Sequence, residues 1–395
     1  MSESKIKFIN HACFSIEKND IVALVDPWFF GKIFNNSWSL MKEQVEYDFL
    51  KKLKYIFITH EHPDHLHWPT LKYIKENCEQ NINVIFVNRG NKNVVDNLRK
   101  MGFLCGEAKP NVDYDIKGFI KFANFPTGHD SAYVFTVDDR VILNQNDCHL
   151  SPQQCTAIKR KYPKIDLWWI QFSLAGYYAN QDDHHGLTAA KEQHKDLIKK
   201  YFNIFRPKTM VPFASFVYFC KEHNSFLNKW ANTIEEISKC LENIPMQIVY
   251  YGDEVKDELD ISRNMINIEK WKQIYNNSYE CLSHKNVSKE EILYEANKFL
   301  VSIKNVDQRF RPQRTTFEFY DKDELFVLDC KRDQCFFSKK ESISNISGIL
   351  PSEEFHFFLK YPWGADTLNI TSCFEIKNKV MWRKILEFKD MIYAR

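Results

Sequence analysis

A group of histidine and aspartate residues directly after an apolar run is the strongest chemical signal in the sequence. The run 55–59 predicts a buried strand, and the motif HEHPDH that follows contains His60, His62, Asp64 and His65. Imidazole nitrogens and carboxylate oxygens form a ligand set that suits zinc or iron better than calcium or magnesium. Because residues two apart in an extended loop point to the same side, we expect His60 and His62 to bind one metal ion. Asp64 and His65 would then turn toward a second ion; the alternative is a polar surface loop.

The sequence around and after this motif resembles the metallo-β-lactamase superfamily. In that superfamily a third histidine for the first metal follows downstream, and His129 in the sequence GHDS has this place just before a predicted strand. A bridging aspartate then ends the next strand, where this chain has Asp147. The resemblance therefore implies that His129 and Asp147 complete the metal ligands. The alternatives are an ordinary loop histidine and an aspartate that serves a turn or a helix cap.

Further motifs narrow the resemblance to two groups within the superfamily. One group contains ascorbate-phosphate lactonases and N-acylphosphatidylethanolamine phospholipase D, and the other is the C-terminal part of CMP-N-acetylneuraminate hydroxylases. The first likeness rests on His11-Ala12, Asp26-Pro27-Trp28 and the segment 34–38. The second rests on His65-Leu66-His67-Trp68-Pro69-Thr70-Leu71, Asn146-Asp147-Cys148, and Pro212-Phe213-Ala214-Ser215-Phe216 followed by His223. Together they cover about residues 5 to 255.

Two departures limit what the resemblance implies. The hydroxylases contain a Rieske iron–sulfur domain, whereas this sequence has no paired CxH and CxxH motifs, so hydroxylation here needs an external reductase. The superfamily position of the last histidine is occupied by Phe213-Ala214-Ser215. The second metal then lacks its usual third imidazole unless His223, His184 or His185 supplies it. Helix capping and exposure to solvent are the alternative for His184 and His185.

Further polar residues are expected to take part in catalysis or substrate binding at this site. We expect Asp64, His223 and His11 to take part in catalysis, with His11 ordering the site or contacting the substrate. The predicted substrate-binding residues are Asn36, Tyr177, His184 and His185. His67 is a candidate to support a metal ligand, and His194 is interpreted as a helix-surface residue.

The predicted elements mix strand meanders with strand–helix units, which indicates an α/β (α+β) protein. Residues 1–255 are predicted to form a four-layer αββα sandwich of the metallo-β-lactamase type, in which 246–251 would be the last strand and 41–53 a polar helix. Residues 256–395 are predicted to form an accessory domain, first helical and then α+β. No motif in the accessory domain indicates chemistry.

Composition excludes several other functions. The 54 basic and 52 acidic residues give a net charge of +2, which offers no basic surface for nucleic acid. The 11 glycines form neither GxGxxG nor a Walker loop. No secretory signal and no membrane span is recognisable, and the 11 cysteines have no regular spacing, so we expect a cytoplasmic protein with reduced thiols.

The leading hypothesis is a metal-dependent hydrolase that acts on a small-molecule ester, lactone, amide or phosphodiester. Two divalent metal ions, zinc or alternatively iron, would lower the pKa of a bridging water and give a hydroxide that Asp64 orients. The runner-up is a non-haem (di)iron oxygenase acting on a nucleotide sugar or related metabolite with an external reductase. A non-catalytic metal-binding module is the third interpretation, and a homo-oligomer is compatible with each.

Overall fold

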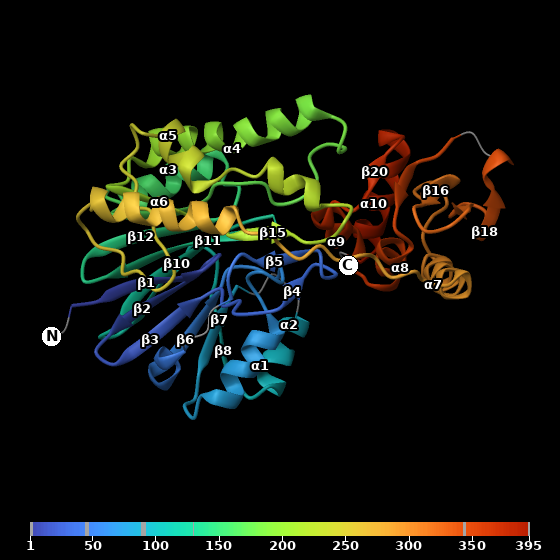
Figure 1. The fold of residues 1–395 in the computed structure, drawn as a ribbon. Helices are drawn as coiled ribbons and strands as arrows, with labels where there is room; N and C mark the ends of the chain where they lie inside the picture. Colours follow the sequence, from blue (N-terminus) through green and yellow to red (C-terminus); the bar gives the residue numbers. More distant parts are fainter. Residues whose placement is uncertain (1–2, 44–46, 88–91, 129, 343–344, 394–395) are drawn as a thin grey trace.

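The computed structural model describes residues 3–43, 47–87, 92–128, 130–342 and 345–393. Two six-stranded sheets form its centre (Figure 1). The first has the order β1 (Lys5–Asn10), β2 (Cys13–Lys18), β3 (Ile21–Val25), β6 (Leu53–Ile58), β7 (Asn83–Phe86), β8 (Leu104–Glu107). The second has the order β14 (Thr209–Phe213), β13 (Leu167–Gln171), β12 (Arg140–Asn146), β11 (Asp130–Val137), β10 (Ile120–Thr127), β9 (Asp113–Ile116).

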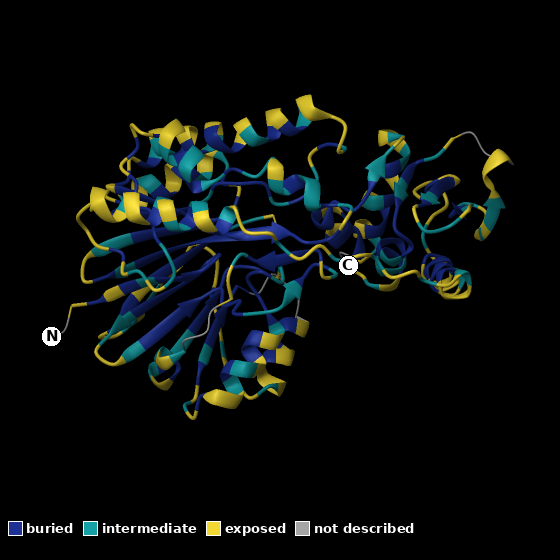
Figure 2. Cartoon of the chain, in the orientation of Figure 1, coloured by how far each residue is buried: buried dark blue, intermediate teal, exposed yellow. Residues whose placement is uncertain are grey.

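The two sheets face each other across an aromatic core. Phe14 of β2 stacks on Trp169 of β13 at 4.7 Å between ring centroids, and Phe57 of β6 meets Phe135 of β11 at 5.0 Å. These large rings are fully buried, and burial of an aromatic side chain stabilises a fold by about 1.5–3 kcal/mol. Figure 2 shows the sheets in dark blue between helices whose outer faces are exposed.

Helices cover both outer faces of this sandwich, as expected from the sequence. The helices α1 (Trp68–Asn77) and α2 (Lys92–Lys100) pack on the first sheet, and Leu71 and Leu98 lie in that core. The helices α3 (Pro152–Lys161) and α4 (His184–Phe205) pack on the second sheet through residues such as Ile158 and Ile198. The predicted αββα layers are therefore confirmed.

The helix α6 (Ile261–Tyr275) also packs on this core, although it follows the predicted domain boundary. Trp271 stacks on Phe216 at 4.0 Å, and its indole nitrogen donates a hydrogen bond to the carbonyl oxygen of Val249. A domain boundary between residues 255 and 256, as predicted, would therefore place α6 in a different domain from the core on which it packs. We call Lys5–Tyr275 the N-terminal module, which also contains α5 (Ile234–Cys240) and a 3-10 helix at Ser225–Lys229.

Two local predictions inside the N-terminal module are wrong. Residues 246–251 form no strand, because their contact with the second sheet is a single bridge between Met210 and Met246 before the chain turns. In the segment 41–53, the helical structure among the described residues is a 3-10 helix at Asp48–Lys52. A small sheet with the order β15 (Val217–Phe219), β5 (Trp38–Leu40), β4 (Lys32–Ile33) connects the start of the chain to the end of the second sheet.

The remaining residues form a separate α+β unit, which we call the C-terminal module (Lys289–Tyr393). Its sheet has the order β18 (Gln334–Lys339), β17 (Glu324–Asp329), β16 (Thr315–Phe319), β19 (Gly348–Leu350), β20 (Glu375–Ile376). Its helices are α7 (Lys289–Ser302), α8 (Ser352–Lys360), α9 (Gly364–Thr371) and α10 (Lys379–Tyr393), with a 3-10 helix at Lys340–Ser342. This module has a hydrophobic core of its own.

The two modules meet through α8, α9 and loops of the N-terminal module (Figure 1). Asn224 donates a hydrogen bond to the carbonyl oxygen of Thr371, and Asn35 donates one to the Glu354 carboxylate at 3.0 Å. No helix in the described part of the chain is both long enough and apolar enough to cross a membrane.

Candidate metal centre

The histidine-rich loop begins where the buried strand β6 ends, and Asp26 at the end of the neighbouring strand β3 holds it. Asp26 is fully buried and accepts two hydrogen bonds from Thr59, one from the backbone nitrogen and one from the hydroxyl, each at 2.8 Å. Its Oδ2 also lies 2.8 Å from Nδ1 of His65. Burial raises the pKa of Asp26, and His65 and Thr59 oppose that effect. The carboxylate therefore fixes both the backbone of the loop and one ring nitrogen of His65.

Neighbouring side chains hold one ring nitrogen of each histidine of the motif and leave the other for the centre of the cluster. Because the Thr59 hydroxyl donates to Asp26, its oxygen accepts from Nδ1 of His60 at 3.0 Å. This contact directs Nε2 of His60 toward Nδ1 of His62, which is 2.9 Å away. Partners of this kind orient the ligands of metal sites and make them more basic.

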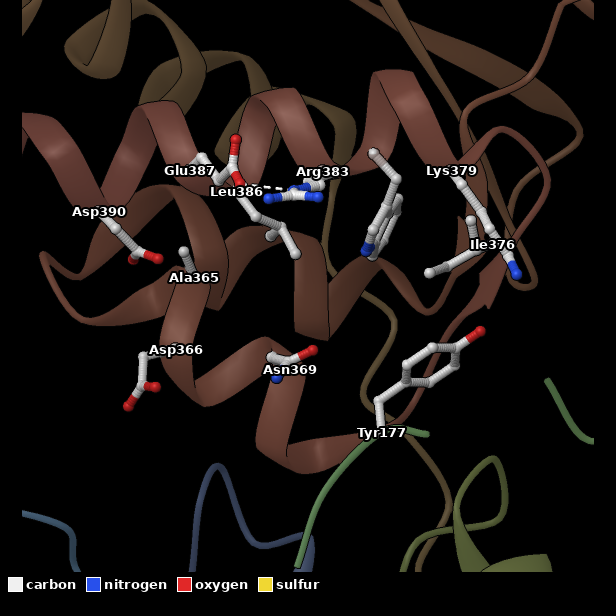
Figure 3. Close-up of a pocket in the computed structure, with 11 residues that line it drawn as sticks. Tyr177, Ala365, Asp366, Asn369, Ile376, Lys379, Arg383, Leu386, Glu387 and Asp390 are labelled. Carbon is white, nitrogen blue, oxygen red and sulfur yellow. Dashed lines mark hydrogen bonds and ion pairs between the residues drawn. The ribbon is translucent and has the colours of Figure 1, made fainter. Parts of the chain in front are cut away.

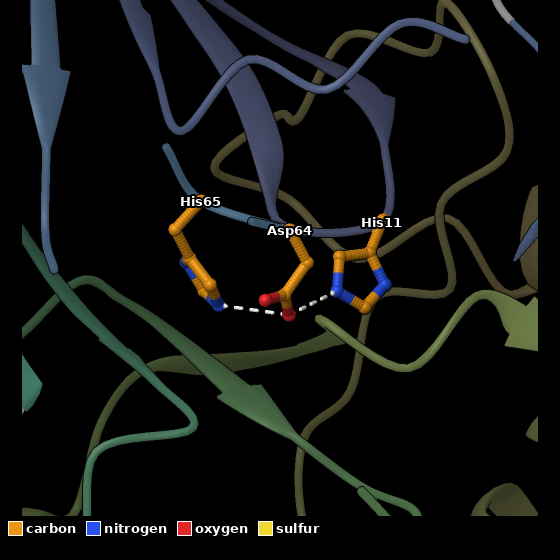
Figure 4. A group of neighbouring side chains, drawn as sticks. All are labelled: His11, Asp64 and His65. Carbon is orange, nitrogen blue, oxygen red and sulfur yellow. Dashed lines mark hydrogen bonds and ion pairs between the residues drawn. The ribbon is translucent and has the colours of Figure 1, made fainter. Parts of the chain in front are cut away.

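The free ring nitrogens converge with carboxylates in three overlapping groups. In each group the ligand atoms lie within 4.8 Å of one another, and the groups are His60 with His62 and Asp130, His60 with His65 and Asp147, and His11 with Asp64 and His65. Figure 4 shows the last group, in which Asp64 Oδ2 lies 3.2 Å from both His11 Nε2 and His65 Nε2. Asp147 lies between His60 and His65, 3.6 Å from the first and 3.5 Å from the second, and so joins the group of His62 and Asp130 to the group of His11 and Asp64.

The electrostatics of the cluster fit divalent cations. Burial by itself would raise the pKa of Asp64 and Asp147, yet His65 and its neighbours hold the pKa of both carboxyls below the ordinary value. Burial and the nearby His65 lower the pKa of His60, so its imidazole is neutral as a metal ligand must be. The buried Oδ1 atoms of Asp64 and Asp147 have no hydrogen-bond partner among the described residues. Buried carboxylate oxygens without a partner are costly, so the two Oδ1 atoms are positions that a cation would satisfy.

His11 lies where the late histidine of the superfamily is missing. Its carbonyl oxygen accepts a hydrogen bond from the backbone nitrogen of Ala214 at 2.8 Å, and its ring faces Asp64. Ala214 belongs to the segment after β14 that replaces the expected histidine. The turn of β1 into β2, with His11 at a positive φ of 27°, therefore brings an imidazole to this side of the cluster.

The other residues predicted for this site lie in different places. His129 is outside the described residues. His223 stacks on Tyr320 at 4.1 Å and groups with Glu222 and His284, away from the His60 cluster. His184 and His185 are exposed at the start of α4, where Asp183 caps the helix, because a helix start presents its first side chains to solvent.

Three more residues singled out from the sequence have contacts that the sequence does not reveal. Asn36 is exposed, and the Cys220 thiol donates to its carbonyl oxygen at 3.2 Å. His67 caps α1 by accepting a hydrogen bond from the backbone of Thr70. His194 is buried rather than on the helix surface, because its ring bonds to the Tyr178 hydroxyl at 3.0 Å.

The C-terminal module contributes a carboxylate to the cluster. Asp366, in the first turn of α9, places Oδ2 at 3.2 Å from Nε2 of His62. Although burial alone would lower it, this carboxylate raises the pKa of His62 to about 9. Asp366 thus holds the outer nitrogen of His62 as Asp26 holds that of His65.

A cavity of about 400 Å³ adjoins Asp366 (Figure 3). Tyr177 borders the cavity, as do Lys379 and Arg383 of α10. Tyr177 stacks on Phe374 at 4.6 Å and donates a hydrogen bond to Asn180. The predicted substrate residue Tyr177 therefore lies on a cavity that is next to the metal cluster.

Three residues of the site were not predicted from the sequence as site residues: Asp26, Asp130 and Asp366. The sequence around Asp26 and Asp130 could have indicated them, since Asp26 follows a strand that neighbours the motif and Asp130 follows His129. The sequence around Asp366 gives no such indication, because 304 residues separate it from His62.

Comparisons with known proteins agree with the fold of the N-terminal module. A family model described as a beta-lactamase superfamily domain matches residues 5–160. Cytidine monophosphate-N-acetylneuraminic acid hydroxylase of Asterias rubens is 37% identical over 78 residues, which cover 19% of this chain and 12% of that protein. The enzyme of Macaca mulatta is 28% identical over 156 residues, which cover 37% of this chain and 26% of that protein. The chain therefore matches about a quarter or less of these relatives.

The solved structures with a similar fold have lower sequence identity to this chain than these relatives have. A metallo hydrolase from Ignicoccus hospitalis is 15% identical, with a TM-score of 0.47 and coverage of 66% of this chain and 100% of that one. CmlA, a diiron β-hydroxylase from Streptomyces venezuelae, is 14% identical, with a TM-score of 0.46 and coverage of 65% and 54%. The family model covers residues 5–160, so this part of the N-terminal module resembles the metallo-β-lactamase superfamily and its branch that contains the CMP-N-acetylneuraminate hydroxylases, and the αββα layers agree with that fold.

Proposed function

We propose that this chain is a dinuclear metal-dependent hydrolase of a small-molecule ester, lactone, amide or phosphodiester. The observation that supports this proposal is the convergence of three ligand groups in one cluster that shares His60 and His65. His60, His62 and Asp130 would hold a first ion together with His129. Asp64, His65 and His11 would hold a second, with Asp147 between them. All of these donors are nitrogen or oxygen atoms, which suit both zinc and iron. Zinc is proposed because hydrolysis uses a Lewis acid without redox chemistry, and iron is the alternative.

Bound divalent ions would supply Lewis-acid charge and a water of lowered pKa, which is the chemistry of hydrolysis at neutral pH. The protein residues orient what the ions bind. Asp64 is held by His11 and His65 through Oδ2, so its second oxygen, Oδ1, is free to accept a hydrogen bond from the attacking water. Asp26 and Asp366 keep His65 and His62 in place. Tyr177 and the cavity beside Asp366 would bind the part of the substrate that does not react.

The second candidate is an iron oxygenase, and the match to CMP-N-acetylneuraminate hydroxylases is the observation that favours it. Such an enzyme would act on a nucleotide sugar or related metabolite. It would need a source of electrons, since no Rieske motif is among the residues of this sequence.

One experiment separates the two candidates. Protein purified without oxygen is analysed for zinc and iron, and each loaded form is then assayed twice. The first assay measures hydrolysis of a panel of nitrophenyl esters, lactones and phosphodiesters. The second measures dioxygen uptake in the presence of a chemical reductant and CMP-activated sugars. The hydrolase proposal predicts that the zinc form hydrolyses members of the panel and that His60→Ala lowers kcat/KM at least about 100-fold. His356→Ala, which changes a half-buried histidine of α8 outside the ligand groups, should stay active. Iron content with reductant-dependent dioxygen uptake and no hydrolysis would replace this proposal with the oxygenase.

A further inference from the structure

A second cluster of potential metal ligands lies between the two modules, away from the His60 cluster. A ring nitrogen of His284, a carboxylate oxygen of Glu354 and the sulfur of Cys373 lie within 4.8 Å of one another. His284 belongs to the segment between α6 and α7, Glu354 to α8, and Cys373 follows α9. We propose that these three residues form a structural zinc site that joins the C-terminal module to the segment at His284, which pairs with the N-terminal module through the bridge between Lys221 and Leu282.

The first argument is the burial of unused polar atoms. The side chains of His284 and Glu354 are 4% and 1% exposed, and Cys373 is completely buried. Nε2 of His284 and Oε2 of Glu354 have no hydrogen-bond partner among the described residues. The Cys373 thiol makes a weak hydrogen bond of 3.5 Å to the carbonyl oxygen of Thr371. Buried polar atoms are nearly always satisfied, so these require a partner that a cation would supply.

The second argument is the charge balance. Lys221, just after β15, is 3% exposed and forms a close ion pair with Glu353, and it lies 3.5 Å from Glu354. Its single positive charge balances Glu353 and leaves a second buried carboxylate. Burial raises the pKa of both Glu354 and Cys373, because it disfavours their charged forms unless a cation lies beside them. With a zinc ion, two cations carrying three positive charges would face three anions, namely Glu353, Glu354 and the Cys373 thiolate.

The third argument is the ligand chemistry. Sulfur, nitrogen and oxygen donors together are typical of zinc sites, whereas calcium and magnesium bind oxygen donors. The ring of His284 also has a carboxylate beside it, since Nδ1 lies 3.3 Å from Glu353. The ring centroid of His223 lies 5.0 Å from that of His284, which makes His223 the candidate for a fourth ligand. This arrangement also gives the late histidine of the hydroxylase-like motif a role outside the His60 cluster.

Cobalt binding tests the proposal, because Co²⁺ replaces zinc and shows a near-ultraviolet sulfur-to-metal band when a thiolate is a ligand. Among the described residues the three ligand groups of the His60 cluster contain no cysteine, so a band from these metal groups would come from Cys373, and the Cys373→Ser variant checks that assignment. We expect metal-free full-length protein to develop the band when Co²⁺ is added, and we expect Cys373→Ser to lose it. The matched control Cys330→Ser changes another fully buried cysteine of the same module and should keep the band.

Zinc content provides the second measurement. After dialysis against buffered zinc, Cys373→Ser should hold one zinc ion fewer per chain than the wild type. If Cys373→Ser fails to fold, His284→Gln should bind Co²⁺ at least about 10-fold more weakly while it keeps Cys373. Absence of the band in the wild type at saturating Co²⁺, or its persistence in Cys373→Ser, would overturn the proposal. The cluster would then be a buried ion-pair network around Lys221.

Discussion

The backbone nitrogen of Ala214 donates a hydrogen bond to the carbonyl oxygen of His11 at 2.8 Å. This bond joins the β1–β2 turn to the segment after β14 and positions the His11 ring 3.2 Å from Asp64. A turn at the start of the chain thereby supplies an imidazole to the side of the cluster where the superfamily uses a histidine from the end of the fold.

Replacement of His11 by Ala should remove the second metal ion and keep the first. The reason is that Asp64 and His65 then retain Asp147 as their only other candidate ligand, whereas His60, His62 and Asp130 are untouched. Zinc is counted by mass spectrometry in a Cys373→Ser background. This background removes the proposed structural zinc site, so the count reports on the His60 cluster. We expect two equivalents to fall to one. Exposed His184→Ala should keep two, and an unchanged count in His11→Ala would show that His11 is not a ligand.

Replacement of Asp26 by Asn should weaken metal binding without a direct loss of a ligand. An amide in place of the carboxylate that faces His65 Nδ1 removes the charge that makes the ring a stronger ligand. We expect metal affinity to fall by about 10-fold to 100-fold, measured by competition with a chromogenic chelator. Asp139→Asn, in the exposed turn between β11 and β12, is the control. Equal metal affinities of the Asp26→Asn and Asp139→Asn variants would show that Asp26 does not support the metal ligand His65.

Replacement of Asp366 by Asn tests whether the C-terminal module supports the metal centre. We expect a loss of metal affinity of about 10-fold or more, because Nε2 of His62 loses its carboxylate. The control Glu387→Gln changes a carboxylate on the same cavity that pairs with Arg383 and does not contact His62. A loss of substrate affinity with full metal affinity would instead make Asp366 a substrate-binding residue.

Lys389 gives a prediction for the pH dependence of stability. Burial among Phe299, Phe358 and Tyr393 lowers the pKa of Lys389 to about 7, and its ammonium donates a hydrogen bond to the carbonyl oxygen of Leu359. The unfolded chain then binds more protons than the folded chain between about pH 7 and pH 10. This group therefore raises the free energy of unfolding with pH in that window by up to about 1.4 kcal/mol per pH unit.

The Lys389→Met variant lacks this titration. Its stability relative to wild type should therefore fall as the pH rises from about 7 to 10, measured by chemical denaturation at several pH values. Lys384→Met, on the exposed face of the same helix, should follow the wild-type curve. Parallel curves for Lys389→Met and wild type would contradict the lowered pKa.

The sequence predicts the parts of the centre that depend on local order. The motif from His60 to His65 follows a buried strand, so the strand pattern and the spacing of its polar residues point to it. Asp147 follows another strand, and the resemblance to the metallo-β-lactamase superfamily implies its role. The structure corrects the expectations for residues at a distance. His223 has the spacing of a late ligand, but β15 and the segment at His284 direct it to the module interface.

Long-range contacts explain the remaining differences. Asp366 approaches His62 because of how α9 docks, and neither residue has a neighbour in the sequence that indicates this contact. The absence of a strand at 246–251 has a similar cause: polar side chains of α6, such as Asn264, take the backbone hydrogen bonds that another strand would make. Docking of one element on another is not encoded by periodicity or spacing, so it is found only in the folded chain.

The most direct test of the dinuclear centre is anomalous diffraction from crystals of the zinc-loaded protein. At the His60 cluster the account predicts two peaks about 3.5–4 Å apart, one beside His60 and His62 and the other beside His65 and His11, separate from any peak at Cys373. A single peak at this cluster, or two peaks of which neither lies within bonding distance of His11, would contradict it.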